Sequence, residues 1–303
     1  MSETIAAVVV THNRLKLLQE CIGAIRNQTR KLDEIIVVNN DSQDGTKEWL
    51  DEQSDLTKIH QENLGGAGGF HNGMKAAYEK GYDWIWLMDD DCYPKFNSLQ
   101  KLIENNDKAE VLNSIVISKS NNNNLCFGLI DYKENKFYDS YSTVSKKDFI
   151  FGANFFNGTL LKREVIDIVG LPNSLFFIYG DEYEYFLRIK LRKLSIISVP
   201  KSIVLHPAQK YRNVTISNLN FRFNYCTKLR ALYFPRNFIL IYIIYKEFKF
   251  IRLLLTLIAD ICFIILFQRR IDLVLIYLKS ITFGVYNTIY KKENYDQRFI
   301  AGL

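Results

Sequence analysis

Three consecutive carboxylates, Asp89, Asp90 and Asp91, follow an apolar run that begins at Trp84. Adjacent like charges repel one another unless a positive group holds them, and a hard divalent cation prefers such oxygen ligands. On an extended chain Asp89 and Asp91 point to one side and Asp90 to the other. We therefore expect Asp89 and Asp91 to share a metal ion or its ligand, while Asp90 forms part of the wall. A solvated acidic turn is the alternative interpretation.

The segment "NLGGAGGFHNG" holds five glycines between Gly65 and Gly73. It is not a dinucleotide-binding fingerprint, because His71 stands where the third glycine is needed. It is not a P-loop either, because Met74 and Lys75 replace the required Lys-Ser/Thr pair. The segment predicts a loop whose backbone approaches a ligand closely, just before a helix N-terminus that favours anions. A plain flexible loop is the alternative.

The elements that must position these groups follow from the apolar pattern of the chain. Runs typical of buried strands occur at residues 5–10, 34–40 and 83–91, with a shorter one within 57–63. Helical patterns occur at residues 11–28, 47–53 and 74–81. Such alternation predicts an α/β fold with a mostly parallel sheet flanked by helices. Ligands bind at the carboxyl ends of such strands, where "THNR", "NNDSQDGT" and "DDD" all fall.

Composition limits the classes of protein that remain. The 303 residues are 48% hydrophobic and allow one or two globular domains. The net charge of +6 is not gathered in a stripe within the first 200 residues, so nucleic acid is not an expected partner. Five scattered cysteines without a CxxC pair indicate a reducing compartment. The start "MSETIAAVVV" is not typical of a signal peptide, so we expect a cytoplasmic protein.

Four blocks, "VVVTHNR", "IIVVNNDSQDGT", "ENLGGAGGF" and "WIWLMDDD", together resemble the family-two inverting glycosyltransferases of the GT-A fold. The resemblance covers roughly residues 5–230. "FNGTLLKREVIDIVGLP" is similar to the family's acceptor-side segment, "FFIYGDEYEYFLR" to its catalytic block and "LHPAQKYR" to its late histidine. The glycine and DDD blocks are most similar to the galactofuranosyltransferase branch, and rhamnosyltransferases share much of the pattern.

The resemblance implies how the chain is divided. It implies a GT-A domain at 1–215, with a nucleotide-sugar half at 1–115 and an acceptor and catalytic half at 116–215. A C-terminal helical region follows at 216–303.

The resemblance also implies a set of donor and metal ligands. Mn²⁺ or Mg²⁺ held by Asp89, Asp91 and His206 would stabilise charge on the leaving nucleotide diphosphate, and an imidazole suits Mn²⁺ better than Mg²⁺. Without that role His206 is simply a strand-end residue. The implied donor-binding residues are Thr11, Asn13, Arg14, Asn39, Asp41, Asn63, Gly65, Gly66, Gly68, Gly69, Asp89 and Asp90.

The base-binding position departs from the pattern of many family members. Asn39-Asn40 stands where they carry Asp-Asn. An asparagine carbonyl still accepts a hydrogen bond from a pyrimidine N3–H, so UDP- and dTDP-linked donors both remain open.

The general base is implied to lie in "GDEYEYFLR". If this stretch opens a helix, Asp181 and Glu184 share one face at i and i+3, and Glu182 points elsewhere. Matching to the family's Glu-Asp-x-Asp pattern makes Glu182 the base, and the swapped order Asp-Glu leaves Asp181 as its rival. Glu184 would bind the acceptor or brace the site, with Asn157 and Gly158 also on the acceptor side. Acids that only favour the helix dipole are the alternative.

The last third of the chain, from Asn237 to Tyr290, is apolar with basic edges. Such helices suit the surface of an anionic membrane. The apolar stretch Phe250–Phe267 contains Arg252 and Asp260, which argue against a spanning helix. A homodimer interface or a hydrophobic cap on the catalytic domain are the alternatives.

The resemblance implies a metal-dependent inverting glycosyltransferase of bacterial surface polysaccharide synthesis. It would move galactofuranose from UDP-galactofuranose to a glycan or lipid-linked glycan, at the inner face of the cell membrane. A rhamnosyltransferase using dTDP-rhamnose and a non-catalytic scaffold with a transferase fold are the alternatives.

Overall fold

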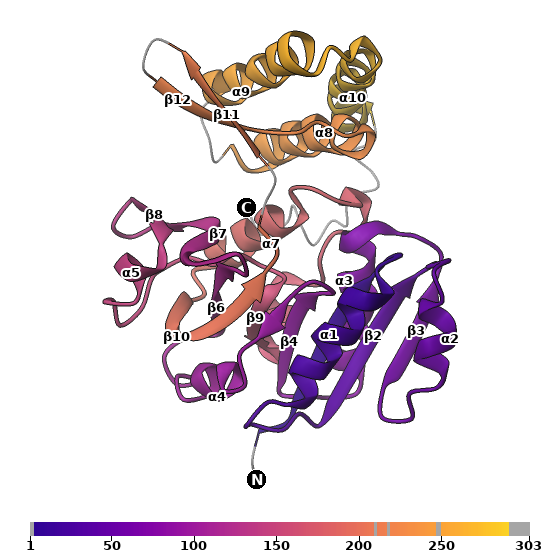
Figure 1. Ribbon diagram of the computed structural model, residues 1–303, viewed down its shortest axis with the longest axis vertical. Coiled ribbons are helices and arrows are strands. Elements are labelled where there is room, and N and C mark those ends of the chain that lie inside the picture. The colour runs from indigo at the N-terminus through magenta and orange to yellow at the C-terminus, as the bar shows by residue number, and fades with distance from the viewer. Residues whose placement is uncertain (1–2, 209–210, 217–218, 247–249, 291–303) are drawn as a thin grey trace. The chain divides into compact units, whose positions relative to one another are not determined.

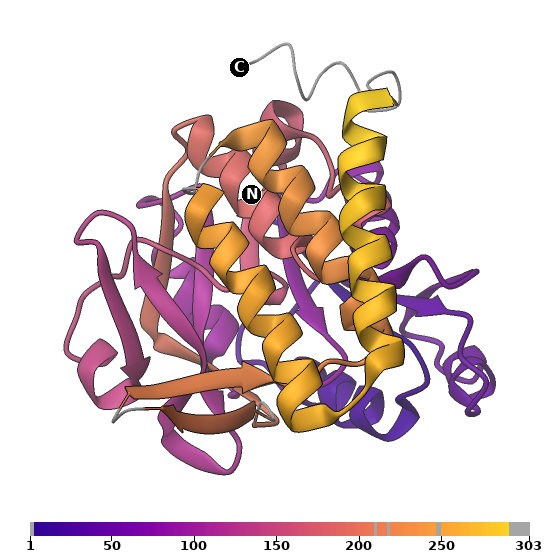
Figure 2. The ribbon, with the colours of Figure 1, turned by 90° about the horizontal axis from the view of Figure 1, so that it is seen from above.

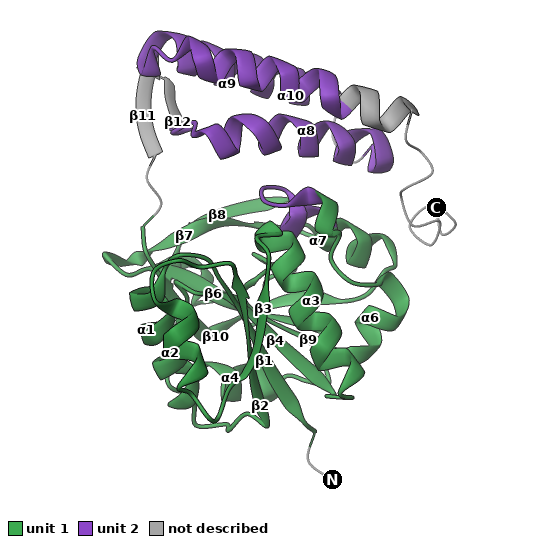
Figure 3. Cartoon of the chain, turned by 90° about the vertical axis from the view of Figure 1, so that its right-hand side faces the viewer, with its two compact units in different colours: residues 1–175, 185–209 green, residues 176–184, 210–303 purple. Residues whose placement is uncertain are grey.

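The computed structural model describes residues 3–208, 211–216, 219–246 and 250–290. The chain divides into two compact units (Figure 3). Unit 1 takes Met1–Leu175 and Tyr185–Gln209, and unit 2 takes Phe176–Glu184 and Lys210–Leu303. The segment 176–184, which holds the predicted catalytic acids, therefore groups with the C-terminal helices and not with the sheet. We call it the acid segment.

Unit 1 is built around one sheet, to which the described residues contribute ten strands. These strands are β1 Ile5–Thr11, β2 Glu34–Asn40, β3 Thr57–Gln61, β4 Trp84–Asp89, β5 Tyr93–Pro94, β6 Val111–Ser118, β7 Asn121–Asp131, β8 Lys136–Ser140, β9 Asn157–Lys162 and β10 Ile196–His206. They run in the order β3-β2-β1-β4-β9-β6-β10-β5, with β7 beside β6 and β8 beside β7 (Figure 1).

The strand directions agree with the α/β prediction. β1 pairs in parallel with β2 and β4, and β2 pairs in parallel with β3. β9 runs antiparallel between β4 and β6, while β6 and β10 are parallel. The predicted fold class and the four predicted strands of the first half are confirmed.

Helices cover both faces of this sheet. In unit 1 and the acid segment they are α1 Leu15–Arg26, α2 Thr46–Asp51, α3 Gly65–Glu79, α4 Ser98–Ile103, α5 Tyr141–Val144, α6 Arg163–Val169, η1 Ser174–Phe176 and α7 Asp181–Leu191. Figure 3 shows α1 and α2 on one side of the sheet and α3 and α6 on the other. Along β1, Ala7 and Val9 pack into the core layer with α1, while Val8 and Val10 pack into the layer with α3. Burial on both faces explains why β1 is apolar throughout.

The glycine cluster is helical, which corrects the predicted loop. α3 begins at Gly65 and contains every glycine of the cluster. A Cβ on Gly69 would lie 2.3 Å from Val10 Cγ1, and one on Gly73 would lie 2.4 Å from Val8 Cγ1. Such distances leave no room for a side chain, so these glycines let the helix pack directly on β1.

Unit 2 has its own helical core. Its described elements are β11 Tyr211–Ile216, β12 Leu219–Asn224, α8 Lys228–Tyr245, α9 Phe250–Phe263, the π-helical turn η2 Ile264–Gln268 and α10 Ile271–Tyr290. α8, α9 and α10 lie side by side (Figure 2). Buried residues of these helices, including Ala231, Leu257 and Tyr277, form one apolar cluster.

Candidate active site

The sheet register brings the predicted donor residues to one edge. Thr11 at the end of β1 lies opposite Asn39 of β2, and Val10 lies opposite Asp89 of β4. Because parallel strands end together, the polar clusters that follow them meet at this edge. The polar residues that follow these strands are therefore brought to one edge, as predicted.

Hydrogen bonds join the loops after β1 and β2. Asn13 N donates to Ser42 Oγ at 2.9 Å, and Gln43 N donates to Asn13 Oδ1 at 2.7 Å. Asn13 and Asp41 have φ angles of 53° and 54°, in the left-handed region that asparagine and aspartate tolerate better than most residues. The two loops therefore form one ordered wall.

His12 was not singled out from the sequence, although it lies inside the "THNR" block. Its Nδ1 lies 2.5 Å from Asn40 O, and its Nε2 lies 3.0 Å from Asn13 Nδ2 and 3.3 Å from Asn63 Nδ2. Asn63 Oδ1 in turn accepts from Gly65 N at the start of α3. His12 thus joins the ends of β1 and β2 to the loop that precedes the glycine helix.

Asn39, the predicted base-binding residue, is 2% exposed. Its Oδ1 accepts a hydrogen bond from Ser42 N at 3.1 Å, and its Nδ2 lies 3.2 Å from His60 Nδ1. A carbonyl oxygen has two lone pairs, so the bond to Ser42 leaves one for a ligand. Its role in pyrimidine recognition remains a prediction.

The three carboxylates do not alternate as on an extended chain, which corrects that part of the prediction. β4 ends at Asp89, and Asp90 and Asp91 lie in the turn that follows. Asp90 accepts from Thr11 Oγ1 at 2.7 Å, and Arg14 Nη1 lies 3.2 Å from Asp90 Oδ1 and 2.9 Å from Asp91 Oδ2. The positive group that holds these two carboxylates together in the structure is Arg14.

The two carboxylates differ in acidity. Burial raises the pKa of Asp90 to about 6, against the opposing effects of Arg14 and Thr11. Burial acts in the same direction on Asp91, but the hydrogen bond and charge of His206, with the charge of Arg14, lower its pKa overall. Asp91 therefore keeps its negative charge to a lower pH than Asp90 does.

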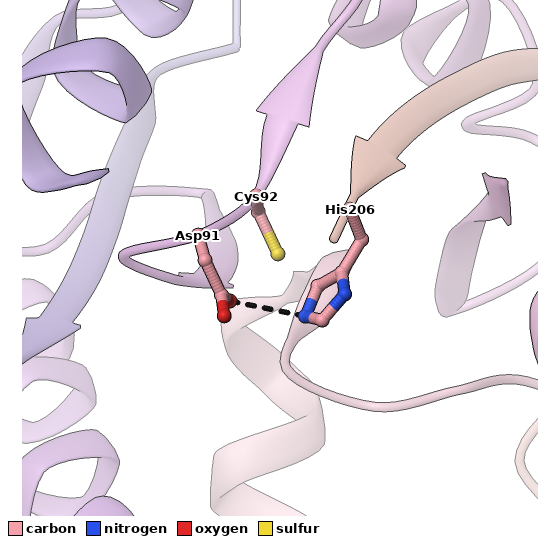
Figure 4. Close-up of side chains that lie close together, drawn as sticks. All are labelled: Asp91, Cys92 and His206. Atoms are coloured by element: carbon pink, nitrogen blue, oxygen red, sulfur yellow. Dashed lines mark ion pairs between the residues drawn. The ribbon is translucent and has the colours of Figure 1, made fainter. Parts of the chain in front are cut away.

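His206 reaches Asp91 because of a short antiparallel pairing. Leu205, the residue before His206 in β10, pairs with Tyr93 of β5. This pairing brings His206 close to Asp91, which precedes β5 by two residues. His206 Nε2 lies 3.0 Å from Asp91 Oδ1 (Figure 4). Burial lowers the pKa of His206, but the hydrogen bond to Asp91 and contact with Cys126 outweigh it and raise the value to about 10.

The chemistry of this donor set fits a divalent cation. Among the described residues, ligand atoms of Asp91, Cys92 and His206 lie within 4.8 Å of one another. His206 Nδ1 lies 2.7 Å from Pro207 O, and a ring N–H donated there leaves Nε2 for a metal once Nε2 has lost the proton that it shares with Asp91. An imidazole nitrogen and a carboxylate oxygen are ligand types that Mn²⁺ accepts, and Nε2 and Oδ1 are already neighbours in the ion pair, 3.0 Å apart.

Cys92 and Asp89 are less suited than Asp91 and His206 to bind a metal at this position. Burial raises the pKa of the Cys92 thiol, which disfavours the thiolate that binds metals. Its Sγ lies 3.4 Å from Asn157 Oδ1. Asp89 is not part of the cluster of Asp91, Cys92 and His206. Its predicted part in metal binding remains a prediction.

The predicted acceptor-side residues of β9 are buried. Asn157 is 5% exposed and donates through Nδ2 to Phe155 O at 2.9 Å. Gly158 has a φ of 88°, and a Cβ there would lie 2.7 Å from Val204 Cγ2. Both residues have a packing role in the structure, and acceptor contact remains a prediction.

The acid segment begins a helix, as the spacing predicts. α7 starts at Asp181. Asp181 and Glu184 are 5% and 2% exposed, while Glu182 is exposed. Burial and the charge of Glu184 raise the pKa of Asp181, although its carboxylate accepts from the backbone N–H groups of Asp181 and Glu182. Glu184 Oε1 accepts from Tyr245 Oη at 2.5 Å.

A model of glycosyl transferase family 2 matches residues 6–167 of the chain. The galactofuranosyltransferase GlfT1 of Mycolicibacterium smegmatis is 35% identical over 217 residues, which cover 68% of this chain and 72% of that protein. GlfT1 of Mycobacterium tuberculosis is 32% identical over 220 residues, covering 68% and 71%. The dTDP-rhamnosyl transferase RfbF of Shigella flexneri is 25% identical over 245 residues, covering 78% and 79%.

A solved structure shares the fold at low identity. The crystal structure of GalNAc-T7 with UDP, GalNAc and Mn²⁺ superposes with a TM-score of 0.58 at 14% identity. The superposition covers 81% of this chain, which spans about half of that protein, at 48% of its length. Sequence and fold agree that the chain belongs to glycosyl transferase family 2 and is a glycosyltransferase of the GT-A fold.

Proposed function

We propose that this enzyme transfers galactofuranose, with inversion, from UDP-galactofuranose to a glycan or lipid-linked glycan acceptor in bacterial surface polysaccharide synthesis. The observation that carries the donor is the 35% and 32% identity to two galactofuranosyltransferases over two thirds of the chain. The polar edge formed by β1, β2 and β4 supports the nucleotide-sugar site.

The proposed functional residues have different roles. Asp91 and His206 hold Mn²⁺ or Mg²⁺, which when bound stabilises negative charge on the leaving diphosphate. Arg14 is bonded to both Asp90 and Asp91, yet its side chain is 51% exposed, so its guanidinium can also face a phosphate. Glu182 accepts the proton of the attacking hydroxyl, because it is the exposed carboxylate of the acid segment.

A donor screen tests this proposal. The full-length enzyme with Mn²⁺ is incubated with UDP-galactofuranose, UDP-galactopyranose, UDP-glucose and dTDP-rhamnose, and release of the nucleotide diphosphate is measured. Release from UDP-galactofuranose at a rate at least about tenfold above the others is expected, since a missing sugar contact costs 10-fold or more in kcat/KM.

The alternative donor has its own support in the similarity to the rhamnosyl transferase RfbF. Faster release from dTDP-rhamnose would replace the galactofuranose assignment. Nucleotide binding without release from any donor, with and without lipid-linked glycan added, would instead favour a non-catalytic scaffold.

We further propose that unit 2 rests on the inner face of the cell membrane. Its helices expose many large apolar side chains, at Ile251, Leu254, Leu255, Ile258, Ile265, Leu266, Ile271, Leu275, Leu278 and Phe283. Arg252 and Lys279 are exposed on α9 and α10, and Arg269 and Arg270 are exposed between η2 and α10. Large apolar surfaces with basic edges are typical of binding to anionic lipids.

A spanning helix is the rival arrangement. Among the described residues one helix, Phe250–Gln268, has the length and composition to cross a membrane. Asp260 was expected to oppose this, but it pairs with Arg230 at 3.1 Å and accepts from Tyr277 Oη at 3.0 Å. Its charge is compensated inside unit 2. Arg252, which is exposed on the same helix, still opposes a spanning position and favours a helical layer on the membrane surface.

Substituting two exposed leucines should release the protein from lipid. Leu255 and Leu266 are 60% and 66% exposed, so aspartates at both positions should fold normally but place charges in the lipid. Binding to phosphatidylglycerol vesicles, measured by co-sedimentation, should fall by more than about tenfold, because burying each leucine contributes roughly 1.5–3 kcal/mol.

Thr256→Asp, at an exposed polar position of the same helix, is the control for added charge. If the protein does not bind vesicles and elutes as a dimer, the exposed apolar residues of unit 2 form a homodimer interface instead.

A further inference from the structure

The backbone of the acid segment is strained just before its carboxylates. Phe177 and Tyr179 have φ angles of 63° and 67°, and Gly180 has a φ of 87°. Bulky residues rarely adopt positive φ, because the side chain crowds the backbone. Such conformations persist only where surrounding contacts determine the backbone, and they cluster at functional sites.

One buried amide on α8 supplies these contacts. Asn237 is 0% exposed, and its Nδ2 lies 2.9 Å from the carbonyl oxygen of Phe176, 3.0 Å from that of Ile178 and 2.7 Å from that of Tyr179. Its Oδ1 accepts from Arg236 Nε at 2.8 Å, which fixes the end of the amide that faces the segment. Two amide hydrogens thus serve three carbonyl groups of the strained turn.

Two further contacts extend along the same face of α8. A Cβ built on Gly180 would lie 3.3 Å from Ile241 Cδ1, so the segment packs closely on the helix. Tyr245 Oη donates to Glu184 Oε1 at 2.5 Å. Positions 237, 241 and 245 are four residues apart and share one helical face. Contacts from α8 therefore flank Asp181 and Glu182 on both sides in the sequence.

We propose that Asn237 and Tyr245 are positioning residues, which hold residues 176–184 in the conformation that the catalytic carboxylates need. The inference rests on the proposed function of the acid segment. It gives α8 a part in catalysis that the family match, which ends at residue 167, does not include.

The decisive variant is Asn237→Asp. It keeps the shape of the side chain but puts an acceptor oxygen against three carbonyl oxygens. The matched control is Ile239→Val, which removes one methyl group from a buried neighbour on α8 that packs in the core of unit 2. Both are made in the full-length protein, and hydrogen exchange, kcat and the affinity for UDP are measured with Mn²⁺ present.

Backbone amides of residues 176–184 should exchange faster in Asn237→Asp, because local opening becomes easier, but not in Ile239→Val. The kcat for transfer should fall by about 10–100-fold, as misplacement of a catalytic group by about 1 Å does. The affinity for UDP should stay within about threefold of wild type, because the substitution is not expected to remove a contact that binds the nucleotide. A loss of kcat without a loss of nucleotide affinity separates positioning from general destabilisation.

Tyr245→Phe is the milder variant, and it tests the positioning role of α8 if Asn237→Asp does not fold. It removes the hydrogen bond that Tyr245 Oη donates to Glu184, and a fall in kcat of about 3–10-fold is expected for one such bond. Normal kcat in Tyr245→Phe, with Asn237→Asp unfolded, would overturn the proposal.

Two other outcomes also overturn it. One is unchanged exchange at 176–184 in Asn237→Asp, and the other is faster exchange with the same kcat as Ile239→Val. If the wild type transfers no sugar in the donor screen, the proposed function fails, and the exchange measurement still decides whether Asn237 holds the segment.

Discussion

Excess EDTA is expected to abolish sugar transfer by this enzyme, and added Mn²⁺ or Mg²⁺ to restore it. The leaving diphosphate gains negative charge as its bond to the sugar breaks, and stabilising that charge through a metal is worth several kcal/mol. A loss of several kcal/mol corresponds to a rate reduction of about 10³-fold or more. The measurement is the initial rate of nucleotide release from the preferred donor, in chelated and in metal-replete enzyme. Full activity in excess EDTA would contradict the metal assignment.

Single substitutions then identify the ligands. Asp91→Asn and His206→Gln each remove one of the two groups whose ligand atoms lie 3.0 Å apart. Losing a residue that only hydrogen-bonds to a metal ligand typically weakens metal binding by roughly 10–100-fold. Each of these substitutions removes a ligand itself, so each should weaken Mn²⁺ binding by more than that. Asp89→Asn, outside the cluster, decides whether that carboxylate also binds the metal. Asp107→Asn, at an exposed position, is the control for loss of a charge. Titration calorimetry with Mn²⁺ and UDP measures all four.

The first half of the fold could be predicted because its strands are buried on both faces. Runs such as Ile5–Val10 are apolar throughout, and polar residues follow each run directly. Parallel pairing then requires these polar ends to meet at one edge, which the register of Thr11 with Asn39 confirms. Local pattern and global fold agree here, so sequence alone suffices.

The glycine cluster shows where local pattern misleads. Glycine disfavours helices by its own propensity, so five glycines in nine positions predict a loop. The helix forms because the methyl groups of Val8 and Val10 lie against Gly73 and Gly69. Tertiary packing decides the conformation, and residues so far away in the sequence give no local signal.

The carboxylates after β4 show the same limit on a smaller scale. The alternation of Asp89 and Asp91 assumes a strand that continues, but the chain turns after Asp89. The turn brings Asp91 to His206, which is more than 100 positions away in the sequence. Family resemblance identifies both residues, whereas periodicity alone cannot pair them.

Neither apolar periodicity nor family resemblance predicts the contacts of Asn237. They join α8 to carbonyl groups 58 to 61 positions earlier. The available signal is the pair Arg236-Asn237 between the apolar stretches 231–235 and 238–245 of α8. A buried amide is costly unless it finds partners, so such a residue predicts a polar contact without naming the partner.

Glu182→Gln is expected to reduce turnover by about 10²–10⁴-fold, the usual contribution of general-base catalysis. The glutamine keeps the shape of the side chain and removes the proton acceptor. Glu182 is exposed at the start of α7, where an acceptor hydroxyl can reach it. UDP affinity, measured in parallel by calorimetry, should hardly change, because the residues at the edge of the sheet are untouched.

Asp181→Asn is the matched control, because the swapped Asp-Glu order makes Asp181 the rival base. Asp181 is 5% exposed, so its carboxylate is less accessible to a substrate, although burial and the charge of Glu184 raise its pKa toward the range that suits a general base. An asparagine can still accept the backbone N–H bonds at the start of α7. Asp181→Asn should therefore keep turnover far closer to wild type than Glu182→Gln does. An inactive Asp181→Asn beside an active Glu182→Gln would transfer the role of base to Asp181. Normal turnover in both would leave Glu184, which accepts from Tyr245, as the remaining carboxylate of the segment.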